Sequence, residues 1–320
     1  WHRPVSVCDH SHFSGETHIE KKRGADVVQA IMEKLVVFLS WTMTLVLCLC
    51  LSIFLTYLLI KGLPSLGAEL IFGKAEPLKV LLGQARVFDG IFPAMAGTFL
   101  LVLLSALLAL PVGVCSGIYL AEYANPGMKK LFRSLFDILA GIPSIVIGLF
   151  GFSLSIFLHN HFSNRFGPCL LISALSLAIL VTPYIVRSTQ MSLEELPSDI
   201  RRTALALGAT RLQNIAYVLI PNALSGISSG LFLAIGRCAE DTAVILLTGV
   251  VATAGVPSSL LSQYEALPFY IYYISSQYSN PAELTNGYGA CLVLLAICSV
   301  LLMFAYGMKK HLAYRMLYRV

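Results

Sequence analysis

Charged side chains are scarce in this sequence of 320 residues. Asp, Glu, Lys and Arg together make up 12% of the chain, whereas soluble proteins carry about 25%. Hydrophobic residues account for 57%, so too little polar surface remains to cover a soluble protein. The composition therefore indicates an integral membrane protein.

Two motifs that carry enzymatic chemistry are missing as well. The sequence has no Gly-x-x-x-x-Gly-Lys-Ser/Thr loop, which cradles nucleotide phosphates. It has no His-Glu-x-x-His pair, which holds the zinc ion of many hydrolases. We therefore expect a chain that is not an enzyme and that binds no cofactor itself. If ATP supplies the energy, another polypeptide must bind it.

Cysteine forms no recognisable metal or disulfide pattern. None of the eight cysteines stands in a Cys-x-x-Cys pair, and seven lie in or beside apolar runs. Packing as small apolar side chains is therefore preferred over metal or disulfide roles. Near the N-terminus, Cys8, Asp9, His10 and His12 have the chemistry of metal ligands. Their surroundings lack hydrophobic periodicity, however, which favours a flexible tail over a preorganised site.

Long apolar runs are what the sequence has instead. A helix needs about 20 apolar residues to cross a hydrocarbon core of about 30 Å, and its backbone must satisfy its own hydrogen bonds there. Six runs qualify, at residues 35–60, 91–120, 138–158, 166–186, 222–249 and 284–308. They predict an all-α polytopic membrane protein with six transmembrane helices. Its parts are a polar arm (1–34), one membrane domain (35–308) and a basic tail (309–320).

Lys and Arg are distributed unevenly between the two sides of the predicted membrane domain. Sixteen of the 22 fall in the arm, the connections between runs two and three and between runs four and five, and the tail. Because cytoplasmic loops carry the excess of basic residues, both termini and the segment 190–217 are expected in the cytoplasm. This bias accounts for the formal net charge of +5. It provides no concentrated basic face for nucleic acid.

One charged cluster interrupts the fifth run. Arg237 lies about 24 Å along a helix from Pro221 at 1.5 Å per residue. A charge at that depth costs about 2.5–3.5 kcal/mol, so it must face a cavity or a partner. Glu240 and Asp241 follow at three and four residues, where helical side chains meet. The cluster is either an ion pair that locks this helix to a neighbour or, as we favour, an anion contact on a translocation path, since guanidinium donors suit oxyanions.

Proline and glycine are expected to interrupt two other runs. Pro111 with Gly113 predicts a break in the second run, and Gly141, Pro143 and Ser144 predict one near the start of the third. Proline removes a hydrogen-bond donor and kinks a helix. The freed carbonyls and the Ser144 hydroxyl could line a polar path. Packing of helices through small residues explains these positions equally well.

Residues 201–221 resemble the cytoplasmic coupling loop of ABC importer permeases. The family pattern is Glu-Ala-Ala, three residues, Gly, nine residues, and then Ile-x-Leu-Pro. Gly208 and Pro221 hold the family interval, and Ala204 matches the last Ala. The other pattern positions are substituted, by Arg202, Thr203, Val218 and Ile220.

Four further stretches are similar to phosphate-specific ABC transporter permeases: residues 113–124, 139–151, 207–211 and 237–242. The last corresponds to the family's Arg-Ala-x-Gly-Glu-Thr. Arg237 and Thr242 are kept there, Glu240 replaces Gly, and Asp241 replaces Glu. Residues 247–249 and 266–273 are closer to the PstA-type subunit than to its PstC-type partner. The resemblance covers residues 90–308.

The resemblance implies the type I permease fold of ABC importers and a role in phosphate import across a bacterial inner membrane. The residues implied for the substrate path are Arg237, Glu240, Asp241, Thr242, Pro143 and Ser144. Those implied for coupling to the ATPase, within short helices, are Thr203, Ala204, Leu207, Gly208, Ala209 and Arg211. Ala204 and Gly208 are expected on one helical face, as a smooth patch for the partner.

The resemblance also implies partners: a homologous PstC-like permease, a dimer of ATP-binding subunits that holds ATP and Mg²⁺, and a periplasmic phosphate-binding protein. Docking of the last would involve residues 63–89 and 251–280. The second segment has no Lys or Arg and many aromatics, for which a belt at the lipid interface is the preferred explanation. Import of molybdate, sulfate or phosphonate stays open as an alternative, as does a membrane scaffold or sensor without transport.

Overall fold

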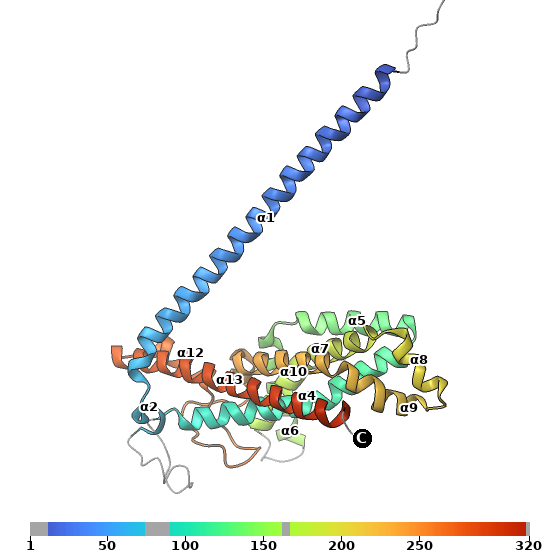
Figure 1. Ribbon diagram of the computed structural model, residues 1–320. Coiled ribbons are helices and arrows are strands. Elements are labelled where there is room, and N and C mark those ends of the chain that lie inside the picture. The colour runs from blue at the N-terminus through green and yellow to red at the C-terminus, as the bar shows by residue number, and fades with distance from the viewer. Residues whose placement is uncertain (1–11, 74–89, 162–166, 318–320) are drawn as a thin grey trace, which may run out of the picture. The chain divides into compact units, whose positions relative to one another are not determined.

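The computed structural model describes residues 12–73, 90–161 and 167–317 and, of residues 12–28, 30 and 312–317, the backbone alone. Within these ranges the regular elements are helices and no strand is found (Figure 1). A single isolated β-bridge in this part of the chain joins Val250 and Tyr264. The fold class is therefore all-α, as the sequence predicts.

Six helices in the described ranges are long and apolar enough to cross a membrane. The main helices of these spans are α1 (His12–Gly62), α4 (Phe92–Glu122), α6 (Ser144–His161), α7 (Leu170–Glu194), α10 (Ile220–Glu240) and α13 (Pro281–Leu317), and the fifth span, Arg211–Glu240, also includes the two short elements before α10. The shorter elements are η1 (Leu63–Ser65), α2 (Ala68–Phe72), α5 (Pro126–Gly141), α8 (Ser198–Ala206), α9 (Arg211–Asn214), η2 (Ile215–Leu219), α11 (Ala243–Thr248) and α12 (Leu267–Gln277). The prediction of six spans is confirmed, and the chain is a multi-pass membrane protein.

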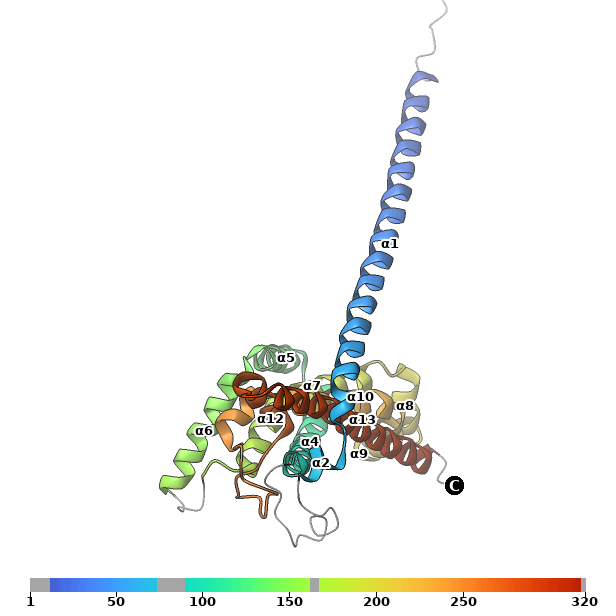
Figure 2. The same ribbon diagram turned by 90° about the vertical axis from the view of Figure 1, so that its left-hand side faces the viewer.

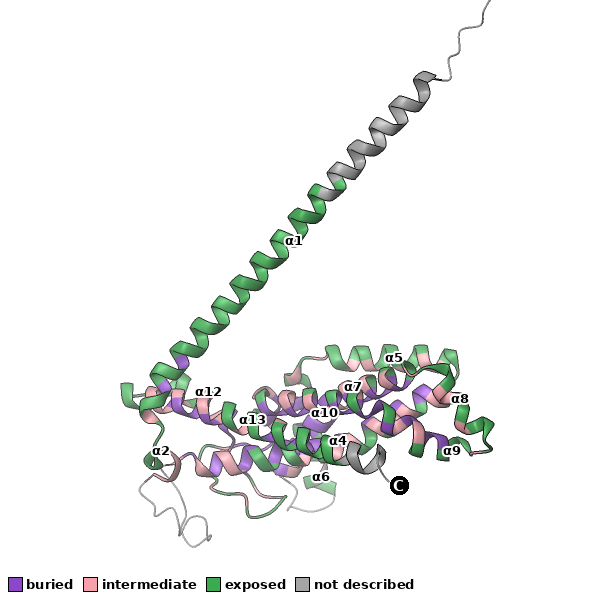
Figure 3. Ribbon diagram, viewed as in Figure 1, coloured by how far each residue is buried: buried purple, intermediate pink, exposed green. Residues whose placement is uncertain are grey.

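Residues 1–57 and residues 58–320 are two compact units. In the first unit, helix α1 carries exposed apolar side chains, among them Phe38 and Trp41 (Figure 3). Such a helix needs lipid or another protein around it. Because α1 begins at His12, the described part of the N-terminal arm is helical rather than unstructured. Cys8, Asp9 and His10 lie outside the described residues.

Helix α7 is the most buried span of the second unit (Figure 3). It packs against α4, α6 and α10. Gly113 and Gly117 of α4 permit the close approach, because a Cβ atom at either position would lie 2.6 Å from Ile185 or Thr189 of α7. Small residues at such contacts are typical of membrane bundles. The break predicted at Pro111 is wrong, since α4 continues through it, and Gly113 serves helix packing.

The contact between α7 and α10 explains a motif that is easily misread. Residues 226–230 have the Gly-x-Ser-x-Gly spacing of a hydrolase nucleophile elbow, which requires a strand-to-helix turn. Here they lie in the middle of α10. A Cβ atom at Gly226 would overlap Ser192 of α7, and one at Gly230 would lie 2.6 Å from Ser188. The spacing therefore belongs to helix packing.

Two of the predicted runs are divided between two helices in the structure. The third run was predicted to start at residue 138, but that residue belongs to α5, and the spanning helix α6 starts at Ser144. Ile142, which precedes Pro143, is extended (φ −67°, ψ 130°), as steric conflict with a following proline favours. The fifth run was predicted as one helix to residue 249, but α10 ends at Glu240 and α11 follows.

Helix α5 lies at the edge of the bundle in both views (Figures 1 and 2). None of its residues is buried. Lys129 connects it to the end of α7 through an ion pair with Glu194 (2.9 Å), and Asp137 pairs with Arg187 (2.9 Å). Exposed ion pairs of this kind contribute about 0–1 kcal/mol each. Its apolar residues Leu131 and Ile138 are exposed.

The segment 249–266 connects α11 to α12 with little regular structure, yet it is firmly attached to the bundle. Val251 N donates to Tyr264 O (3.0 Å), and Leu170 N of α7 donates to Ser262 O (3.1 Å). Tyr264 is fully buried. This segment therefore holds a defined position against the ends of α4 and α7.

Gly97→Ala is expected to lower the free energy of unfolding by about 1–3 kcal/mol, the usual cost of overpacking. A Cβ atom at Gly97 of α4 would overlap the backbone carbonyl oxygen of Glu265, which cannot rotate away. Thermal unfolding of the purified protein in detergent measures the loss. Gly307→Ala is the matched control, because no atom lies within 4 Å of a Cβ placed there. Equal midpoints for the two variants would contradict this close contact.

Candidate functional site

Arg237 stands on the last turn of α10 with its two carboxylates close by. Its Nη1 lies 2.7 Å from Glu240 Oε1, and its Nη2 lies 3.6 Å from Asp241 Oδ2. The Glu240 side chain is 63% exposed, whereas that of Asp241 is 2% exposed. One partner of the guanidinium is therefore accessible to exchange, and the other is held in place.

Asp241 is held because it also ends one helix and starts the next. It is extended (φ −78°, ψ 110°), and its Oδ1 accepts a hydrogen bond from Val244 N (3.0 Å) in the first turn of α11. A carboxylate in this position satisfies an amide that has no partner within the helix. Thr242 lies between the two helices. The break after Glu240 therefore positions Asp241 against Arg237.

The guanidinium retains hydrogen-bonding capacity. Its Nε is buried and has no acceptor among the described residues. The 3.6 Å separation from Asp241 exceeds hydrogen-bond length, and the close pair with Glu240 is exposed. The two carboxylates leave a local charge of minus one, which suits passage of an anion rather than tight retention.

The alternative of an ion-pair lock between spans receives no support from these contacts. Both acidic partners of Arg237 in the described part of the chain belong to its own segment, at three and four residues. Pairs of this spacing stabilise a helix by about 0.2–0.5 kcal/mol. Their loss would change the helix end more than the contact between helices.

Pro143 and Ser144 are connected to this cluster through the packing of α6 on α11. A Cβ atom at Gly148, one turn after Ser144, would lie 3.0 Å from Val244 Cα. Pro143 is exposed and Ser144 is half-buried. The structure therefore brings the start of α6 to the helix that Asp241 caps. Within the described ranges, neither residue forms a hydrogen bond or ion pair with Arg237.

The predicted coupling residues lie at one end of the bundle, around α8 and α9 (Figure 1). The expectation that Ala204 and Gly208 share a helical face is wrong, because α8 ends at Ala206. Gly208 has φ +88°, and Gly208 N and Ala209 N donate back to Leu205 O and Ala204 O. Glycine terminates helices in this left-handed conformation because it has no side chain to strain.

The surface around this turn is apolar and exposed. Leu207 is 84% exposed, and Leu212 and Tyr217 are comparably exposed. Thr203 and Arg211 are also exposed. Leu212 and Tyr217 were missed by sequence reasoning; apolar residues in a polar, basic segment are the signal that could have identified them. An exposed apolar patch rimmed by polar residues is typical of a protein interface.

Arg201 attaches this surface to the membrane bundle. Its Nη1 lies 3.2 Å from Glu122 Oε1 at the end of α4, and its Nη2 donates to Leu193 O near the end of α7. The backbone carbonyl of Arg201 accepts from Asn214 Nδ2 of α9 (2.9 Å). These partners surround a cavity of about 330 Å³. Sequence reasoning missed this connection because its members are far apart in the chain.

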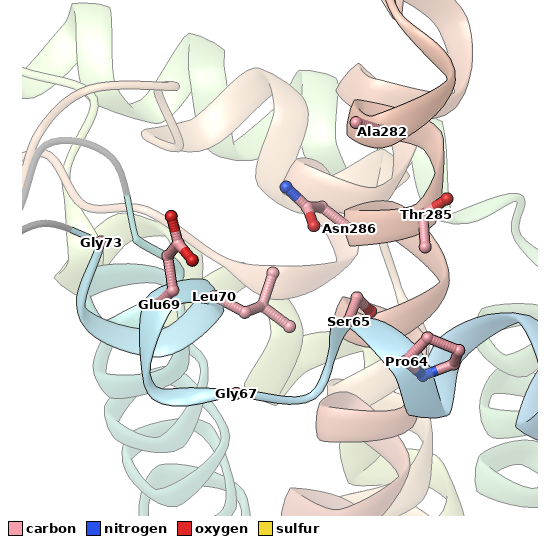
Figure 4. A pocket seen from close by; sticks show the side chains of 9 residues that line it. All are labelled: Pro64, Ser65, Gly67, Glu69, Leu70, Gly73, Ala282, Thr285 and Asn286. Atoms are coloured by element: carbon pink, nitrogen blue, oxygen red, sulfur yellow. The ribbon is translucent and has the colours of Figure 1, made fainter.

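The opposite end of the bundle has a recess of about 800 Å³ between η1, α2 and the start of α13. Figure 4 shows Glu69 of α2 and Asn286 of α13 on opposite sides of it. Close packing supports this arrangement, since a Cβ at Gly289 would contact Leu70 at 2.8 Å. The recess belongs to the first predicted docking segment, 63–89, of which residues 74–89 lie outside the described residues.

The chain is similar in sequence to transport proteins of several bacteria. The chain is 33% identical to the phosphate transport system permease protein PstA of Haemophilus influenzae, covering 83% of this chain and 90% of that protein. It is 31% identical to PstA of Yersinia pestis, covering 78% and 82%. It is 29% identical to the probable ABC transporter permease protein YqgI of Bacillus subtilis, covering 75% and 82%.

A solved structure shares the fold. A bacterial ABC transporter involved in the import of the acidic polysaccharide alginate aligns with a TM-score of 0.55 and 16% identity, covering 83% of this chain and 95% of that chain. The predicted ABC importer permease fold is confirmed. Residues 113–318 match the family model of binding-protein-dependent transport system inner membrane components, and the chain belongs to this family.

Proposed function

We propose that this chain is the transmembrane permease subunit of an ATP-driven importer of inorganic phosphate in a bacterial cell membrane. The proposal rests on the surroundings of Arg237, which lies on a membrane span. Its Nε is buried and has no acceptor among the described residues, and its partner Glu240 is exposed and can be exchanged. The names of the Haemophilus and Yersinia relatives support phosphate as the cargo.

In the proposed mechanism an incoming phosphate displaces Glu240 from Arg237. The planar donors of the guanidinium bind two oxygens of the anion at once. Asp241 stays in place because Val244 N also donates to it. Its carboxylate can accept a hydrogen bond from the P–OH group of a protonated phosphate. Return of Glu240 then releases the anion. Pro143, Ser144 and Thr242 would line the adjacent path.

The free energy of ATP hydrolysis would act on the permease at the end of the bundle that carries α8 and α9. The exposed surface of α8 and the turn at Gly208 would dock on a cytoplasmic ATP-binding subunit, one of a pair that holds ATP and Mg²⁺. Both termini would lie on that same side, as the distribution of Lys and Arg predicts. A homologous, PstC-like permease would complete the path. A soluble periplasmic phosphate-binding protein would supply it.

Reconstitution tests this function. The chain is purified with its co-expressed partners, placed in lipid vesicles with the soluble binding protein, and assayed for phosphate uptake and phosphate-stimulated ATP hydrolysis. Phosphate should stimulate both activities, and sulfate and molybdate should not. Stimulation by another oxyanion instead of phosphate would identify that oxyanion as the transported substrate. Absence of stimulation by any of them would favour a scaffold or sensor.

Arg201→Met is expected to reduce the phosphate transported per ATP hydrolysed by about tenfold. The substitution removes the attachment of α8 to Glu122 and Leu193 O, and charged hydrogen bonds of this kind contribute about 1.5–3 kcal/mol each. Movement of the ATPase would then no longer reach α4 and α7. Arg202→Met is the matched control, because Arg202 is exposed and has no ion pair within the described residues. Equal transport ratios for both variants would contradict this role.

A further inference from the structure

A second cavity, of about 510 Å³, lies at the end of the bundle opposite α8 and α9. It is formed by the segment 249–266, by α12 and by the start of α13, which Figure 1 shows at the far end from α8. The aromatic residues that line it are Phe269, Tyr270, Tyr273 and Tyr278. Two carboxylates, Glu265 and Glu283, also line it.

Both carboxylates are held in position by the backbone. Gly255 N donates to Glu265 Oε1 (2.7 Å), and Ser279 N donates to Glu283 Oε2 (2.8 Å). The backbone next to Glu265 is itself attached to α4, because Leu267 N donates to Thr98 Oγ1 (2.8 Å). Backbone donors thus fix both carboxylates at the cavity, in a preformed site.

Among the residues that the structure describes, no positive charge lines or pairs with the acids of this cavity. Residues 238–308 contain no Lys, Arg or His, and within the described ranges neither Glu265 nor Glu283 forms an ion pair. Lys61, a basic residue at this end of the bundle, is not part of the lining. In the described part of the chain, the cavity therefore holds two acidic groups beside aromatic rings and no basic partner for them.

The carboxylates influence the groups around them. Burial raises the pKa of Glu265 above its usual range, and the backbone amides of Gly255 and Ala254 oppose that shift. Burial also raises the pKa of Tyr270, and the negative charges of Glu265 and Glu283 raise it further. Both carboxylates therefore act on the same ring hydroxyl, which indicates that they face one shared space.

Such a cavity is unsuited to an anionic cargo and suited to a cationic group. Two carboxylates repel phosphate, whereas they attract an ammonium or guanidinium group and bind it through charge-assisted hydrogen bonds. Aromatic faces add about 0.5–2 kcal/mol of cation–π attraction. A belt that only anchors the chain in lipid requires aromatic rings alone, so the two acids need another explanation.

The rim of the cavity indicates that the cation belongs to a protein. Tyr273 and Tyr278, which line it, are 43% and 50% exposed. In the same segment 249–266 and in α12, Val256, Leu260 and Tyr272 are also exposed large hydrophobic side chains. Tyrosine and arginine are enriched where protein interfaces bind most strongly. A free small amine would use the cavity but not this surrounding surface.

We propose that this cavity receives a Lys or Arg side chain of the soluble protein that delivers the substrate to the permease. The inference rests on the proposed function, because that function requires such a delivery protein. It adds the chemistry of recognition: a basic side chain inserts between Glu265 and Glu283 and stacks on the tyrosine rings. The surrounding apolar surface packs against the delivery protein.

The test measures binding of a purified soluble phosphate-binding protein from the same cells to the whole permease–ATPase complex in lipid nanodiscs. Glu265→Gln and Glu283→Gln remove charge but keep an oxygen that accepts the backbone hydrogen bonds. Each variant is expected to weaken binding about tenfold at low salt, and the double variant more. Glu33→Gln is the matched control, because Glu33 is an exposed carboxylate that lies outside both predicted docking segments and does not line this cavity.

The outcomes separate this inference from the proposed function. Unchanged affinity in both Gln variants overturns it, even if the wild-type complex imports phosphate. Weaker binding accompanied by a lower unfolding temperature also overturns it, because the acids would then serve only to hold their loops. A third outcome would assign the cavity to a free amine instead. In that case spermidine at 1 mM would bind the wild type but not the double variant, and the Gln changes would leave the affinity for the binding protein unchanged. Failure of phosphate to stimulate ATP hydrolysis in the wild type would reject the function alone.

Discussion

Arg237→Ala is expected to lower phosphate uptake by about 100-fold or more while the assembled complex stays intact. Removal of one charged partner from a desolvated contact costs about 2–5 kcal/mol, which corresponds to roughly 30-fold to several thousand-fold. The loss should fall on transport, because the substituted side chain is the proposed contact of the anion. Uptake into vesicles that contain the whole complex measures it.

Assembly should survive because the ion pairs of Arg237 are local. Glu240 is exposed, and Asp241 keeps its hydrogen bond from Val244 N. Size-exclusion chromatography of the solubilised complex provides this readout. Arg237→Lys is the matched variant, since it keeps the charge but loses the planar fork, and it should retain partial uptake. If Arg237→Ala separates the subunits, the cluster has a structural role in place of the proposed one.

Gly208→Trp is expected to abolish coupled transport by detaching the ATPase. The backbone at Gly208 has φ +88°, and no atom lies within 4 Å of a Cβ placed there. A side chain at this position costs about 1–2 kcal/mol in backbone strain, and a tryptophan would project from the exposed surface around Leu207. The amount of ATP-binding subunit that copurifies with the membrane subunits, and phosphate uptake, measure the effect.

Gly208→Asn separates bulk from backbone strain. Asparagine tolerates the left-handed conformation better than other residues with side chains, so this variant should keep most of the copurifying ATPase and most of the uptake. Normal uptake with Gly208→Trp would remove this surface from the coupling mechanism. Equal loss in both variants would assign the effect to the turn itself.

Much of the candidate site could be predicted from the sequence because its members stand out locally. Arg237 is a charge in an apolar run, and Gly208 keeps a fixed interval from Pro221. Their surroundings could not be predicted in the same way. Asp241 was expected in the middle of a helix, but it caps α11. The chain could either continue α10 or start a new helix at this point, and the packing of α11 on α6 favours the new helix.

The ion pair that attaches the coupling surface and the cavity with two carboxylates could not be predicted from the sequence either. Arg201 and Glu122 are 79 positions apart, and Glu265 and Glu283 are ordinary polar residues outside any motif. Such pairs leave no periodic pattern, because each member follows the local rules of its own loop or helix end. They become a contact or a cavity only when distant helices pack together.

The sequence by itself determined the membrane class, the six spans and the deep arginine. A helix in lipid must satisfy its own backbone with its own residues, so hydrophobic length and charge suffice to identify it. Only the tertiary structure decided where the spans break, which helices the coupling surface is attached to, and which acids share a cavity. These depend on contacts between residues far apart in the chain, as at Gly113, Gly226 and Gly97, where the absence of a side chain lets a distant segment approach closely.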